Sequence, residues 1–136
     1  MIKDEHYDAG LALRRAMFGS AGAEDQVEHT TDLNDKIQEV VTRYCFGDVW
    51  QREGLDLRTR SLITLAMLVA TGRSHEIRIH LRGAVANGAT EEEIRELMLH
   101  SFLYCGIPAA MDGFRAVEEM LSTSPADVAS EEAAHV

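Results

Sequence analysis

Proline is scarce in this sequence, and long apolar runs are missing. The 136 residues include 2 prolines and 10 glycines, which leaves room for long helices. No stretch approaches the roughly 20 consecutive apolar residues that cross a bilayer, and the start MIKDEHYD lacks the apolar core of a signal peptide. We therefore expect a cytoplasmic protein with no membrane partner.

Positive charge is also in short supply. The 13 lysine and arginine residues are outnumbered by 23 aspartate and glutamate residues, so the formal net charge is -10 at pH 7. A chain with this charge repels the phosphate backbone that dominates affinity for nucleic acids. DNA and RNA are therefore not expected as partners.

Cysteine occurs twice, as Cys45 and Cys105, far apart in the sequence. This spacing provides neither a CxxC redox motif nor a zinc-binding pattern. In a reducing cytosol, two such thiols are expected to pack as small hydrophobic groups.

The pattern of apolar residues predicts helices throughout and no β-alternation. Residues 3–18 mix acidic and basic groups around apolar ones, as a surface helix does, and Gly19 follows them. Asp32 is expected to cap a second helix that ends at Gly47. That helix would carry one apolar stripe, made of Leu33, Ile37, Val40, Val41 and Tyr44.

A third predicted helix begins near Asp56 or Thr59 and ends at Gly72. Residues 62–70 are apolar on every side of it, so we expect it to be central. Ser74 is expected to cap the next helix, which closes at Asn87 and Gly88.

The last two helices have the clearest beginnings. Thr90 and Glu93 form a T-x-x-E capping box, and Glu91 can pair with Arg95 one turn later. Pro108 then stands where a first-turn proline is tolerated, in a helix that runs to about Leu121.

These elements predict an all-α fold, a compact bundle-like domain of about six helices over residues 1–121. Residues 122–136 mix Ser, Thr, Pro, Ala and Glu with almost no large apolar side chain. We expect this tail to be disordered.

The most informative candidate for chemistry is Glu76 with His80, four residues apart and therefore neighbours on one helix face. A carboxylate can orient an imidazole and raise its pKa, which makes an acid/base unit that works near neutral pH. The alternative is a solvated ion pair, which is common at this spacing. The segment HEIRIH is not the H-E-x-x-H metalloprotease motif, and no further metal ligands are evident, so no metal is expected.

Three other side chains can serve either a site or the core. Arg60 lies at the start of the apolar central helix, where a guanidinium needs an anion or a structural ion pair. Trp50, the single tryptophan, and Tyr104 either line a pocket or pack in the core with one polar tip satisfied.

Four segments carry a family resemblance that is more specific in combination than any one of them: RYCFGDVW, LDLRTRSLITLAML, GRSHEIRIHLRGAVANGATEEEIRE and FLYCGIPAAMDGFR. From about Tyr7 to Leu121 the chain resembles the carboxymuconolactone decarboxylase family, in its bacterial 4-carboxymuconolactone decarboxylase branch. The alkylhydroperoxidase D-like branch has a CxxC motif before the equivalent histidine. Here Arg73 and Glu76 stand at those positions, so the resemblance favours the decarboxylase branch.

The resemblance implies an alkylhydroperoxidase D-like all-α subunit that assembles into a homo-oligomeric ring, a trimer or a hexamer. It implies cofactor-free decarboxylation of 4-carboxymuconolactone, a small anionic lactone, to β-ketoadipate enol-lactone in protocatechuate catabolism. Met111 occupies a place that is often smaller in the family, which leaves the particular lactone open.

For that reaction we expect Arg60 and Arg73 to bind the substrate's anionic groups and His80 to deliver a proton. Glu76 would orient His80, while Trp50 and Tyr104 would contact the substrate, Trp50 as a wall that excludes water. Two alternatives remain open: a thiol-dependent peroxide reductase, and a ring-forming binding protein without catalysis.

Overall fold

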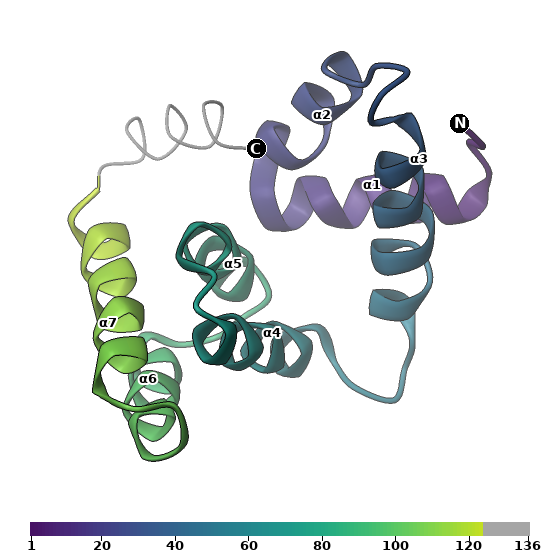
Figure 1. The fold of residues 1–136 in the computed structure, drawn as a ribbon. Coiled ribbons are helices and arrows are strands. Elements are labelled where there is room, and N and C mark those ends of the chain that lie inside the picture. Colours follow the sequence, from purple (N-terminus) through teal and green to yellow (C-terminus); the bar gives the residue numbers. More distant parts are fainter. Residues whose placement is uncertain (124–136) are drawn as a thin grey trace. The chain divides into compact units, whose positions relative to one another are not determined.

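The computed structural model describes residues 1–123, and this part of the chain is built from helices without a strand (Figure 1), which confirms the all-α class. The chain divides into two compact units, an N-terminal one over residues 1–56 and a C-terminal one that begins at Leu57. The expected tail falls almost wholly on residues 124–136, which lie outside the described residues. None of the helices in residues 1–123 combines the length and apolar character that crossing a membrane requires.

The N-terminal unit begins with α1 (Glu5–Phe18), followed by the short helices η1 (Gly19–Gly22) and α2 (Glu24–Glu28). It continues with α3 (Asp35–Glu39), η2 (Val40–Phe46) and η3 (Val49–Gln51). Asp4 caps α1 by accepting a 3.1 Å hydrogen bond from the amide of Tyr7. The residues of η2 form a π-helix, a wider turn than the α-helix expected there.

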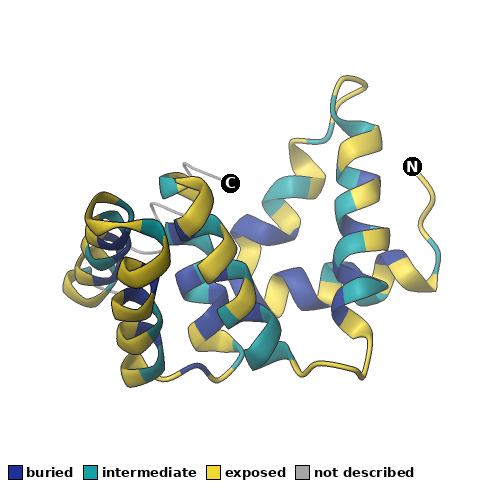
Figure 2. Cartoon of the chain, turned by 60° about the horizontal axis from the view of Figure 1, so that its bottom comes forward, coloured by how far each residue is buried: buried dark blue, intermediate teal, exposed yellow. Residues whose placement is uncertain are grey.

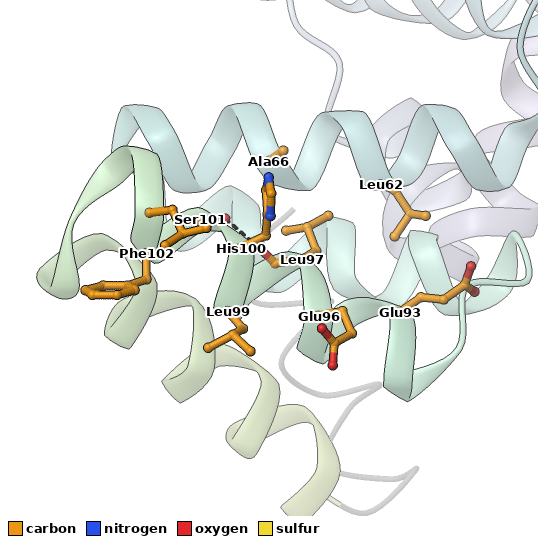
Figure 3. A pocket seen from close by; sticks show the side chains of 10 residues that line it. Leu62, Ala66, Glu93, Glu96, Leu97, Leu99, His100, Ser101 and Phe102 are labelled. Carbon is orange, nitrogen blue, oxygen red and sulfur yellow. Dashed lines mark hydrogen bonds between the residues drawn. The ribbon is translucent and has the colours of Figure 1, made fainter.

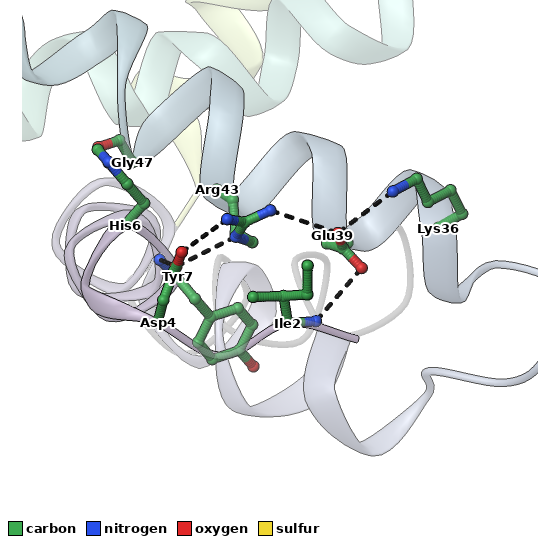
Figure 4. A network of polar contacts seen from close by, with 8 residues as sticks. All are labelled: Ile2, Asp4, His6, Tyr7, Lys36, Glu39, Arg43 and Gly47. Atoms are coloured by element: carbon green, nitrogen blue, oxygen red, sulfur yellow. Dashed lines mark hydrogen bonds and ion pairs between the residues drawn. The ribbon is translucent and has the colours of Figure 1, made fainter.

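A polar network fixes the start of the chain against η2 (Figure 4). The Arg43 guanidinium donates to both carboxylate oxygens of Asp4, at 3.1 and 2.6 Å, and lies 3.4 Å from the carboxylate of the buried Glu39. Glu39 also accepts from Lys36 and from the amide of Ile2. Arg43 holds the pKa of the Asp4 carboxyl far below its usual range, so this ion pair is formed at neutral pH.

The predicted apolar stripe on the second helix is not its buried face. Leu33 is 95% exposed and Tyr44 is 63% exposed, and Ile37 and Val40 are exposed as well. The buried positions carry Glu39 at the end of α3, and Thr42 and Phe46 on the π-helix, which packs against α1. The helix also begins at Asp35 rather than after a cap at Asp32.

The C-terminal unit consists of four longer helices: α4 (Leu57–Thr71), α5 (Ser74–Ala86), α6 (Glu91–Cys105) and α7 (Ile107–Ser122). Each buries one side and leaves the other exposed (Figure 2). The hydrophobic core of this unit contains Leu65, Val69, Ile77, Leu81, Ala84, Ala89, Ile94, Met98, Ala116 and Val117.

The expected central helix, α4, packs against α5, α6 and α7, which confirms its central place in this unit. Its apolar surface is only partly buried in the described chain. Ser61, Leu65 and Val69 are buried, while Met67 is 62% exposed and Ile63 is also exposed. Three helices cover only part of the circumference of α4, and its remaining apolar face is open.

In the C-terminal unit, the capping box and the left-handed glycine follow the sequence signals, and the expected cap at Ser74 does not. Thr90 and Glu93 make both hydrogen bonds of the capping box, at 3.1 and 2.9 Å. Gly88 has a φ of +95°, in the left-handed region that favours glycine, where α5 ends. Ser74 does not cap α5, because its hydroxyl donates to Asp112 on α7 instead.

Candidate active site

Helix α5 presents the Glu76 and His80 pair that the sequence predicted on one face. Glu76 is exposed and His80 is half-buried. The Glu76 carboxylate raises the pKa of His80, as its spacing indicates, but burial of the imidazole lowers it more strongly. The net pKa of His80 is about 4, lower than its ordinary value of 6.5. The expectation of an imidazole that titrates near neutral pH is therefore corrected: burial keeps His80 neutral at pH 7.

Packing fixes the direction in which α5 presents this pair. Ile77 and Leu81 are fully buried on the adjoining face of the helix, and Ala84, one turn after His80, is fully buried as well. Two polar contacts tie α5 to α7: Ser74 donates to Asp112 at 2.5 Å, and Arg78 binds both carboxylate oxygens of Glu119 at 2.6 and 2.9 Å. A two-point contact of this kind limits rotation of the helix.

The supporting residues Arg78, Asp112 and Glu119 were not expected from the sequence. In each contact, the residue on α5 and its partner on α7 are about 40 residues apart along the chain, and no local pattern connects them. The usable signal is the amphipathic period of α7, which puts Asp112 and Glu119 seven residues apart on one helix stripe.

The two arginines expected to bind anions lie on α4 and beside α5. Arg60 is half-buried in the second turn of α4, where its carbonyl accepts a 2.8 Å hydrogen bond from Thr64. Arg73 is exposed and directly precedes α5 at its N-terminal end. Both belong to the C-terminal unit together with Glu76 and His80.

The two aromatic candidates have different surroundings. Trp50 lies in the N-terminal unit, 8% exposed, with its ring 5.4 Å from that of Phe46, so the expectation that it packs inward is confirmed. Tyr104 lies near the end of α6, 80% exposed, with its ring 5.4 Å from that of His100. Their expected contact with substrate stays a prediction.

A groove of about 790 Å³ lies between α4 and α6 in the C-terminal unit (Figure 3). Leu62, Ala66, Leu97, Leu99 and Phe102 give it an apolar lining, and His100 points across it toward α4. Its charged lining residues, Glu93 and Glu96, are both acidic. Glu93 forms an ion pair with Arg58, so Glu96 remains as the acidic charge, and no lysine or arginine lines the groove to bind the anionic groups of the expected lactone.

Cys45 and Cys105 are both free thiols of intermediate burial. Burial raises the pKa of the Cys45 thiol, which lowers its nucleophilicity at neutral pH. Within residues 1–123, no three His, Cys, Asp or Glu side chains are grouped to hold a metal ion.

The buried His80 makes stability depend on pH in a defined direction. Between its folded pKa of about 4 and its unfolded value near 6.5, the unfolded chain binds more protons. The contribution of His80 to the free energy of unfolding therefore falls by about 3 kcal/mol as the pH is lowered through this window. Urea unfolding of the wild type and of His80→Gln at pH 7 and pH 4 should show their stability difference changing by this amount. A difference that stays constant with pH would contradict the burial of a neutral imidazole.

The model of the carboxymuconolactone decarboxylase family matches residues 35–119 of this chain. The 4-carboxymuconolactone decarboxylase of Acinetobacter baylyi is 39% identical over 120 residues, which cover 88% of this chain and 90% of that protein. The nitrosuccinic acid decarboxylase npaB of Metarhizium robertsii is 36% identical over 116 residues, 85% of this chain and 81% of that protein.

These matches cover most of the described helices, including α4, α5 and α6 in full. The chain belongs to the carboxymuconolactone decarboxylase family. Both named relatives are decarboxylases, and the class of this protein is accordingly that of a carboxy-lyase.

Proposed function

We propose that this protein removes carbon dioxide from 4-carboxymuconolactone and forms the enol-lactone of β-ketoadipate, in the breakdown of protocatechuate. The observation that carries the proposal is the 39% identity to a 4-carboxymuconolactone decarboxylase over nearly the whole length of both chains. The buried His80 beside Glu76 adds a titratable group of strongly altered pKa, as active sites often contain.

The chemistry of this substrate requires no cofactor. The carboxylate that leaves is attached to the γ carbon of an unsaturated lactone, so the electrons of the broken bond flow into the ring carbonyl. The protein has to bind the anionic groups, stabilise the developing enolate oxygen and supply a proton to the α carbon. In this proposal Arg60 and Arg73 bind the anionic groups, and Trp50 and Tyr104 contact the lactone.

His80 supplies the proton in this proposal, and Glu76 orients its ring. An imidazole that is neutral in the free protein has to gain a proton before it can act as a cationic acid. A bound substrate with two carboxylates provides the negative charge that raises the pKa of a nearby imidazole. Substrate binding and protonation of His80 would thus support each other.

The decisive experiment follows carbon dioxide release and the lactone product from synthetic 4-carboxymuconolactone. Nitrosuccinic acid is the matched comparison, because it also has two carboxyl groups and its nitro group can accept the electrons left by carbon dioxide. Preferred turnover of the lactone supports the proposal. Preferred turnover of nitrosuccinic acid would place the protein with the second relative, and no turnover of either would favour a binding role.

Neither cysteine has a role in the proposed reaction. Changing both Cys45 and Cys105 to Ala should leave kcat/KM within about tenfold of the wild-type value, although each cavity costs on the order of 1 to 2 kcal/mol of stability. Circular dichroism checks that the variant is folded before the assay. Loss of turnover in a folded double variant, together with thiol oxidation by peroxide in the wild type, would favour the peroxide reductase instead.

We also propose that the subunit forms a closed homo-oligomer, a trimer or a hexamer. The C-terminal unit exposes large apolar side chains on α4, α6 and α7, beyond what a monomer usually leaves open: Ile63, Met67, Leu99, Phe102, Leu103, Tyr104, Ile107 and Met111. Light scattering should give a mass several times the 15.1 kDa subunit mass. Leu103 is 67% exposed in the single chain and would be buried between subunits in the oligomer. Leu103→Glu should lower the measured mass, because burying the new charge in that contact is costly. A monomer at micromolar concentration would refute this proposal.

A further inference from the structure

The N-terminal unit buries a cation that has no acidic partner among the described residues. Arg14 on α1 is 6% exposed, and within residues 1–123 no carboxylate forms an ion pair with it. Its neighbour Arg15 is half exposed and pairs with Glu24 at 2.5 Å. An arginine keeps its proton in proteins, so the charge of Arg14 persists in the interior and favours an anion nearby.

The hydrogen bonds of Arg14 involve only neutral groups. Its Nη1 donates to Oε1 of Gln38 at 3.1 Å and to the hydroxyl oxygen of Thr42 at 2.9 Å. Its Nε is buried and has no acceptor among the described atoms. The guanidinium is thus held in place by two side chains that both accept from Nη1, while the buried Nε–H remains open to a further acceptor.

A cavity of about 10 Å³ adjoins this group, lined among others by Tyr7, Leu11, Arg14, Val27 and Thr42. This volume is the space open to the centre of a water-sized sphere, so the cavity can hold one small species. The buried Tyr7 ring and Leu11 give it an apolar side, and a wall of low polarity strengthens the attraction between a cation and an anion.

Two amide oxygens and one hydroxyl oxygen of the polar lining already accept hydrogen bonds. Oε1 of Gln38 already accepts from Arg14, and Oε1 of Gln26 accepts from the side-chain amide Nε2 of Gln38 at 2.9 Å. The Thr42 hydroxyl accepts from Arg14, which leaves its own proton for donation. The hydroxyl oxygens of Thr30 and Tyr7 could accept from a water molecule, so it is the positive charge of Arg14 that favours an anion over water.

We propose that the N-terminal unit binds one monatomic anion, chloride or bromide, in this cavity through Nε of Arg14 and the hydroxyl of Thr42. The ion would neutralise the buried guanidinium between α1 and the π-helix η2. It would thereby stabilise the contact between these two elements.

The test uses the full-length protein in sodium chloride and in sodium gluconate at equal ionic strength. Gluconate is too large for the cavity. Chloride should raise the wild-type melting temperature by about 4 °C in a saturable way. The Arg14→Met variant should lose this dependence, and the matched Arg15→Met variant, which removes an exposed arginine, should keep it.

Bromide-soaked crystals provide a second measurement that needs no variant. Anomalous density beside Nε of Arg14 would support the site directly, even if Arg14→Met does not fold. In that case Thr42→Val replaces it as the variant that should weaken the chloride effect. Equal melting temperatures in both salts, or a water molecule with no anomalous signal in the cavity, would overturn the proposal.

Discussion

Replacing His80 by Ala is expected to lower kcat by a factor of about 10² to 10⁴ without unfolding the protein, because the enolate would lose its proton donor. The buried imidazole contributes no charge at neutral pH, so its removal leaves no uncompensated ion. Stopped assays of carbon dioxide release measure kcat, and light scattering with circular dichroism monitors the folded state. His29→Ala is the matched control, since His29 is exposed at the end of α2.

Combining substitutions tests whether Glu76 and His80 act as one catalytic unit. If Glu76 acts only by orienting His80, the double variant Glu76→Gln with His80→Ala should be hardly slower than His80→Ala alone. Independent effects that multiply would show that Glu76 has its own role. Near-native turnover by His80→Ala would instead indicate that the pair has no catalytic role, and Tyr104 or a bound water would become the candidate proton donor.

The pair also shows which part of a site a local pattern can predict. The i, i+4 spacing correctly indicated that the Glu76 carboxylate raises the pKa of His80. The spacing contains no information on desolvation, which depends on the helices packed around α5. That larger effect lowers the pKa to about 4 and could be found only from the folded chain.

Helix ends were predictable because their signals are local. The capping box at Thr90 and the left-handed glycine Gly88 each involve a few neighbouring residues, and both occur as expected. The π-helix of residues 40–46 was not predictable in this way. This π-helix packs against α1, which ends more than 20 residues earlier in the chain.

Apolar periodicity predicted helices but not the partner of each apolar face. The stripe that contains Leu33 and Tyr44 has the spacing of a buried face, yet both side chains are exposed in the single chain. The exposed side of α4, with Met67, presents the same difficulty. A sequence pattern shows that one face of a helix is apolar. It does not show whether that face is buried within one chain or between copies.

Replacing Gly10 by Ala is expected to destabilise the N-terminal unit by at least about 3 kcal/mol, a large value for one methyl group. Gly10 lies in α1 where the helix backbone directly meets η2. A Cβ built there would overlap the carbonyl oxygen of Thr42 and would lie 2.9 Å from the amide nitrogen of Gly47. Both neighbours are backbone atoms, so relief requires the two helices to move apart.

The sign of this effect makes the prediction sharp. In an ordinary helix interior, Gly→Ala stabilises by about 1 kcal/mol, because alanine has the higher helix propensity. Urea unfolding of Gly10→Ala should show the opposite sign. The matched control is Gly54→Ala, where a Cβ meets nothing within 4 Å, and a change within about 0.5 kcal/mol is expected. If Gly10→Ala were as stable as the wild type, the close backbone contact between α1 and η2 could not exist as described. The position of the cavity beside Arg14, which residues of both elements line, would then also be in question.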